Sequence, residues 1–182
     1  MIYKSDDAEK RSAFAVADKM VAAAKTAPKG CGEDNVAALI LDGNDKAVLS
    51  AHMRDIAKET GAEFFNRDAR NIDESHCVVL IGVVSNPLGL EHCGMCGFKN
   101  CGEMKKAGAN CTFNVTDLGI AVGSAVSIAA DNRIDNRVFF SAGQAAVRMG
   151  CFPSSVRVCF GIPLSTSAKS LFFDRDPGNV MV

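Results

Sequence analysis

The sequence predicts an α+β domain that carries a cysteine-rich insertion. Two observations support this prediction. Amphipathic helical segments alternate with short β-branched runs, and the stretch 85–116 lacks any hydrophobic period yet holds four of the eight cysteines. A chain of 182 residues is also long enough to form a hydrophobic core without help from a metal. We therefore expect one α+β domain over residues 1–182, with a metal-binding insertion at 85–116.

The first elements are a helix and a strand. Between residues 10 and 27 the apolar side chains recur at spacings of three and four, which indicates an amphipathic helix. Pro28 and Gly30 should end this helix. The apolar run 36–42 is short and is followed by a glycine–asparagine pair, so it is expected to be a buried strand.

The next elements are a helix and two strands. Asp45 is a suitable N-cap and Gly61 a suitable C′ residue for the intervening helix. A strand at 62–65 and a polar connection are then expected. The run 77–84, CVVLIGVV, is rich in β-branched residues and predicts a central strand.

Helical periodicity returns after the cysteine-rich stretch. Asp117 is a plausible N-cap for a helix that extends to about residue 129. The later expected elements are a strand at 136–140, a helix from a Ser141 cap to Met149 that Gly150 ends, and a last strand at 156–162. Pro163 should end that strand, and 165–182 should form a partly ordered tail.

Composition argues against two classes of partner. The formal net charge is −1, with 20 basic and 21 acidic residues, so no basic field favours nucleic acid or an anionic membrane. The apolar run 77–84 is far shorter than the ~20 residues that span a bilayer. The polar start, MIYKSDDAEKR, lacks the apolar core of a signal peptide. We therefore expect a cytoplasmic protein that binds neither nucleic acid nor membrane.

Four cysteines form the strongest motif. Cys93, Cys96, Cys101 and Cys111 give the spacing C-x2-C-x4-C-x9-C, with a glycine directly after each of the first three. Such short intervals let four thiolates converge on one centre, and thiols in the cytosol more often serve metal or redox chemistry than disulfides. The spacing favours an iron–sulfur cluster of the [4Fe–4S] type. A zinc site and reduced or disulfide-bonded cysteines remain alternatives.

Other reactive side chains give weaker signals. Cys77 and Cys159 lie in apolar runs and are expected in the core, whereas Cys31 lies in a glycine-rich loop. His92 adjoins the first motif cysteine and is either a substitute ligand or a surface residue. No Ser/His/Asp triad, Walker loop, GxGxxG fingerprint or HExxH motif is present, so the catalytic residues stay unknown.

The sequence also resembles two known groups of proteins. The segments CGMCGFKNC and DLGIAVGSAVSIAADNRIDNRVFFSAGQAA resemble a family of uncharacterised prokaryotic proteins described as containing a ferredoxin domain. That resemblance implies that the four motif cysteines are the cluster ligands. It covers nearly the whole chain.

The second resemblance is to the flavin-dependent nitroreductase fold. It rests on Thr26–Pro28, Asp117–Ala121 and Gly161–Pro163, which match its turn, helix and late strand. It implies a three-layer α+β homodimer in which FMN lies near residues 29–35. The cofactor-binding candidates implied by this likeness are Lys29, Gly32 and Asn35.

The sequence thus predicts a cytoplasmic iron–sulfur redox protein that passes single electrons through the cluster. Its partner would be a redox protein or a small organic acceptor, and an FMN-dependent oxidoreductase is one version of this hypothesis. The alternative is a non-enzymatic sensor or interaction protein in which zinc or a cluster only orders the insertion. A role in cluster delivery is a third hypothesis.

Overall fold

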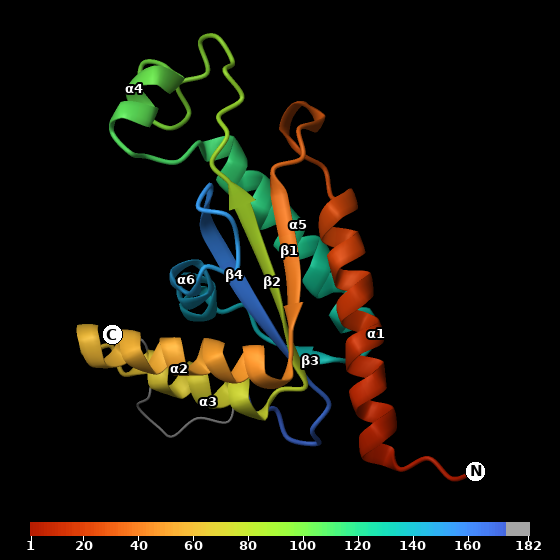
Figure 1. The fold of residues 1–182 in the computed structure, drawn as a ribbon. Helices are drawn as coiled ribbons and strands as arrows, with labels where there is room; N and C mark the ends of the chain where they lie inside the picture. The colour runs from red at the N-terminus through yellow and green to blue at the C-terminus, as the bar shows by residue number, and fades with distance from the viewer. Residues whose placement is uncertain (174–182) are drawn as a thin grey trace.

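The computed structural model describes residues 1–173. Within them lies a four-stranded antiparallel sheet of order β1-β2-β4-β3 (Figure 1). The strands are β1 (Val36–Leu41), β2 (Cys77–Val84), β3 (Asp135–Asn136) and β4 (Val156–Ser165). Strand β2 pairs with β1 through Leu39 opposite Leu80, and with β4 through Leu80 opposite Gly161. It is therefore the central strand that its β-branched sequence predicted.

Helices cover both faces of the sheet, which gives three layers (Figure 1). One face carries α1 (Ser5–Thr26) and α5 (Thr112–Asp131). The other carries α2 (Gly43–Thr60), α3 (Phe64–Glu74) and α6 (Phe140–Met149). The predicted α+β, three-layer architecture is confirmed.

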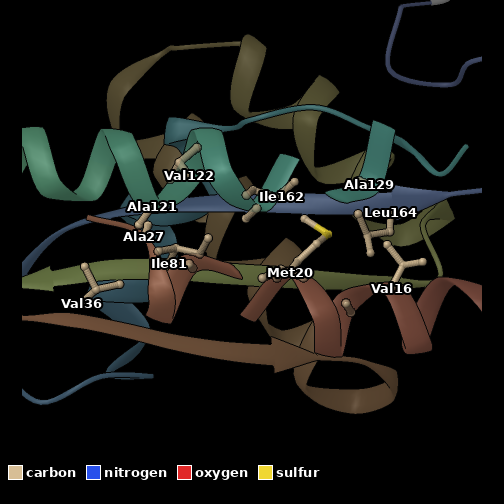
Figure 2. Close-up of a cluster of buried hydrophobic side chains, with 14 of the residues drawn as sticks. Val16, Met20, Ala27, Val36, Ile81, Ala121, Val122, Ala129, Ile162 and Leu164 are labelled. Carbon is tan, nitrogen blue, oxygen red and sulfur yellow. The ribbon is translucent and has the colours of Figure 1, made fainter. Parts of the chain in front are cut away.

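The core is divided into two clusters because side chains alternate along β2. Val79 and Ile81 face α1 and α5, and Val78 and Leu80 face the other helices. Figure 2 shows the first cluster, in which Met20 of α1 points toward strand and α5 side chains. Burial on both faces explains why β2 is apolar along its whole length.

Helix α5 combines length with low polarity. Among the described residues it is the one helix that length and composition would allow to cross a bilayer. In the structure Leu118, Ala121, Ala125 and Ala129 are fully buried against α1 and the sheet. Packing in the core therefore accounts for the apolar side chains on the inward face of α5.

Several predicted elements differ from the structure. Asp45 lies inside α2, whose N-cap is Asp42. The strand predicted at 136–140 is limited to β3, because Phe140 already belongs to α6.

The expected strand at 62–65 is wrong, because Phe64 begins α3. Its buried face contains the polar residues Asp68 and Asn71, which disguised the helical period in the sequence. Strand β4 also continues through Pro163 to Ser165. The proline nitrogen faces the β3 side of the strand, as Gly161 does, and β3 has only two residues, so a missing N–H is tolerated there.

The helix boundaries after the insertion also differ. Helix α5 begins at Thr112 with Cys111 as its N-cap, so the predicted start at Asp117 is wrong. The N-cap of α6 is Phe139 in place of Ser141, while Gly150 ends this helix with a left-handed φ of 75° as expected. The insertion itself contains a short helix, α4 (Cys101–Lys106), where no period was seen. The tail prediction for 174–182 lies outside the described residues.

Candidate metal centre and the adjoining turn

The cysteine-rich insertion leaves the sheet at the end of β2 and returns as α5, projecting beyond the end of the sheet (Figure 1). Its first half folds by tight backbone turns. Gly94 and Gly97 have φ values of 58° and 81°, and the Gly97 N–H donates to the Gly94 carbonyl at 2.9 Å. Glycine is needed at both positions because other residues rarely adopt this conformation. The chain therefore turns tightly between Cys93 and Cys96.

The second half of the insertion is fixed by hydrogen bonds. The Asn100 side chain caps α4 by accepting from the Glu103 N–H at 3.0 Å, so the helix begins at Cys101. Met104 anchors α4 with 1% of its surface exposed. The guanidinium of Arg157 on β4 donates to the carbonyls at the end of the insertion, including that of Ala109 at 3.2 Å.

All four motif cysteines line one cavity of about 300 Å³. Cys111 is buried, and Cys93, Cys96 and Cys101 are half-buried. Within residues 1–173 no three Cys, His, Asp or Glu side chains stand close enough together to hold a metal ion. The thiols therefore line one cavity without forming the compact set that a single metal ion needs.

The cavity wall between the cysteines is mostly apolar. Its other lining residues include Leu90, Met95, Phe98, Met104 and Phe113. One cation, Lys99, also lines it and can offset part of the negative charge of four thiolates. His92 lies at the same cavity with a φ of 57°. These residues give the cavity a low-polarity inner wall and a partly exposed rim.

Three asparagines connect the two ends of the insertion to β1. The Asn86 N–H donates to Oδ1 of Asn114 at 3.0 Å, and Nδ2 of Asn86 donates to Oδ1 of Asn35 at 3.2 Å. Asn86 lies two residues after the end of β2, and Asn114 lies in the first turn of α5. The insertion therefore leaves and re-enters the body at one clamped point. No motif in the sequence marked these residues, because their partners are far apart along the chain.

The three predicted cofactor residues in the turn between α1 and β1 have different surroundings. The Lys29 ammonium donates to carbonyls in the last turn of α1, including that of Ala24 at 3.1 Å, and to the carbonyl of the C-cap Ala27 at 2.8 Å. Asn35 is 9% exposed and is bound by Asn86. Gly32, in the short 3-10 turn η1 (Gly30–Gly32), has open space around its Cα. Two of the three predicted residues thus have structural partners already.

The side chain of Asp117 in α5 binds this turn, although the sequence predicted Asp117 as a helix cap. Its Oδ1 accepts a hydrogen bond from the Gly30 N–H at 3.0 Å. Its Oδ2 is buried and has no partner among the described residues. A carboxylate in the second turn of α5 therefore fixes the turn that follows α1.

The cysteines outside the motif divide as expected. Cys77 is fully buried and Cys159 is 6% exposed. Burial raises the pKa of each of these thiols to about 12. Both are therefore protonated core residues at neutral pH. Cys31 is exposed, with a left-handed φ of 55°.

The family is established by two comparisons. Residues 107–175 match a family model described as an uncharacterized protein containing a ferredoxin domain. An uncharacterized protein from Archaeoglobus fulgidus is 39% identical over 166 residues, covering 87% of this chain and 89% of that protein. The chain belongs to this ferredoxin-domain family. The matched range contains Cys111 and begins after the other three motif cysteines, which makes their placement at the same cavity an independent observation.

Solved structures show which fold this ferredoxin-domain protein has. A Bacteroides thetaiotaomicron protein described as an NADH dehydrogenase/NAD(P)H nitroreductase aligns with a TM-score of 0.57 and 11% identity, over 85% of this chain and 74% of that one. An FMN-dependent nitroreductase from Clostridium difficile aligns with a TM-score of 0.54 and 15% identity, over 85% and 76%. The fold is therefore nitroreductase-like, as the second resemblance predicted.

Proposed function

We propose that this protein is a cytoplasmic redox protein in which Cys93, Cys96, Cys101 and Cys111 hold a [4Fe–4S] cluster. The observation that carries the proposal is the convergence of all four thiols on one cavity. Membership in a family described by a ferredoxin domain supports the same chemistry. When bound, such a cluster accepts and releases one electron at a time.

The chain supplies a defined environment at this cavity. Met104 and Phe113 exclude water from its inner side, and low polarity there influences the reduction potential. The outer rim carries exposed apolar side chains, with Leu90 40% and Met95 59% exposed. A redox partner protein could dock on this rim with a short path to the centre. The half-buried cysteines then lie on the side from which electrons enter or leave.

The test is an anaerobic absorption spectrum combined with iron, sulfide and zinc analysis of the same sample. We expect a broad band near ~400 nm that bleaches with dithionite, and about four irons and four sulfides for the four thiolates. One zinc per chain and no colour would refute the proposal. That result would leave a metal-ordered sensor or interaction protein.

A second candidate adds a flavin to this scheme, and the nitroreductase-like fold favours it. One structural neighbour is described as FMN-dependent. In this chain the open side of η1 at Gly32, together with Asn35, would adjoin the flavin, and a small organic molecule would be the final acceptor. Stoichiometric FMN after anaerobic purification would support the enzyme. Purification without flavin would leave the electron carrier.

We also propose that the protein acts as a homodimer. The outward face of α5 carries no charged residue between Thr112 and Ala130 and exposes Val115 and Ile120 by 39% and 41%. Such a face is suited to contact with a second copy. Light scattering should give about twice the chain mass of 19.2 kDa. A monomer at micromolar concentration would refute this assembly.

A further inference from the structure

One corner of the candidate centre differs from the other three. Cys93, Cys96 and Cys101 are half-buried, whereas Cys111 is 8% exposed and is the N-cap of the 20-residue helix α5. Its side chain makes no capping hydrogen bond. The first N–H groups of a helix have no partner within the helix, so this thiol lies where negative charge is stabilised.

A second observation at this corner concerns Asn114. Its side chain is 1% exposed, and its Nδ2 is buried without a hydrogen-bond partner among the described residues. An unsatisfied buried amide donor costs free energy and is rare in native proteins. Its presence therefore needs an explanation.

The direction of this amide group is fixed by its neighbour. The Asn86 N–H is a backbone donor and can bond only to the oxygen of the Asn114 amide, at 3.0 Å. The Nδ2 group must therefore point away from Asn86. Asn114 is the third residue of α5, the position toward which an N-cap side chain is directed, and Cys111 and Asn114 border the same closely packed pocket.

We propose that Nδ2 of Asn114 donates a hydrogen bond to the Cys111 sulfur when the cluster is bound. This inference rests on the proposed function. Asn114 is then a positioning residue that holds one corner of the centre against the body. Because reduction adds negative charge at the sulfurs, a donor at this corner stabilises the reduced state and raises the reduction potential.

The test compares reduction potentials of the purified, cluster-loaded chain and its variants by spectroelectrochemical titration. Asn114→Asp keeps the acceptor for Asn86 and replaces the donor with a charged oxygen. At a fixed solution potential we expect the ratio of oxidised to reduced cluster to rise about tenfold. This corresponds to a fall in the reduction potential of about 59 mV for one electron. Asn114→Leu should shift it in the same direction by less. Asn66→Asp, which adds the same charge on α3, should leave the potential unchanged.

Unchanged potentials in both Asn114 variants, each with a full cluster, would overturn the inference and leave the proposed function standing. If neither variant retains a cluster, the wild-type environment is measured by electron–nuclear double resonance with 15N in asparagine side chains. Asn100 and Asn110 are replaced by serine to remove nearby label. A persistent nitrogen coupling supports the hydrogen bond, and its absence overturns it. Wild-type protein without iron and sulfide would instead refute the proposed function.

Discussion

The body of the molecule and its cysteine-rich insertion are ordered by different means. Residues 77–81 of β2 are all fully buried, whereas among residues 85–110 Met104 is the one buried side chain. Burial of apolar surface can offset the conformational entropy lost in the body. The insertion buries too little for that. Its order depends on backbone turns, on the hydrogen bonds of Arg157 and the asparagines, and on the proposed cluster.

The largest effect expected from this contrast follows Cys96→Ser. Removing one thiolate from the cavity should lower the iron content to near zero, because four corners need four ligands. The body should keep its fold, since its core does not include this residue. Iron analysis and far-ultraviolet circular dichroism measure the two outcomes.

The matched control for this change is Cys31→Ser, which alters an exposed cysteine outside the motif and should keep full iron content. Global unfolding of Cys96→Ser would show that the body depends on the insertion. The contrast between the two regions would then be wrong.

The same substitution in both regions tests the contrast directly. Leu80→Ala removes a fully buried side chain from β2 and should lower the free energy of unfolding by about 2–5 kcal/mol. Leu90→Ala in the insertion, where the side chain is 40% exposed, should cost less than about 1 kcal/mol. Urea unfolding of the two variants measures the two losses in free energy. Equal losses would mean that the insertion is part of the cooperative core.

The smallest effect concerns the thiols of the body at alkaline pH. The pKa of Cys77 and of Cys159 is raised from 9.0 to about 12 in the folded chain, so above pH 9 the unfolded chain loses these protons first. The stabilisation is therefore complete below pH 9 and declines as the pH rises through 12. Each thiol should account for about 1 kcal/mol between pH 9 and 10.

Urea unfolding across this pH range measures the decline, and Cys77→Ala should make it shallower. Iodoacetamide provides a second readout. At pH 8 it should modify the exposed Cys31 while leaving Cys77 and Cys159 protected. Rapid modification of Cys77 would show that the body opens as easily as the insertion.

Sequence reasoning succeeded where the physical cause was local. Strand β2 was predicted with its actual bounds because burial on both faces demands an uninterrupted apolar run. The glycines that end α2 and α6, Gly61 and Gly150, were predicted because a left-handed C′ residue favours glycine. The four motif cysteines line one cavity, and their role as cluster ligands stays a prediction.

Sequence reasoning failed where a partner lies far away in the chain. Asp68 obscured the apolar period of α3 because this polar residue lies on the buried face of the helix. Its carboxylate binds Arg67 at 2.8 Å and Ser141 of α6 at 2.6 Å. Asp117 looked like a helix cap but binds the turn after α1. The roles of Asn86 and Asn114 depend on β2 and α5 ending side by side. None of these pairings leaves a pattern along the sequence.

The clamp between Asn86 and Asn114 has a consequence for the length of the insertion. The Asn86 nitrogen and Oδ1 of Asn114 are 3.0 Å apart, so the chain leaves the body and returns to it at nearly the same place. The body therefore sets almost no limit on the length of the chain between these two residues. Lengthening such a closed loop costs little, since the closure entropy grows only with the logarithm of its length. The chain between these two residues can thus change in length with little cost to the three-layer body.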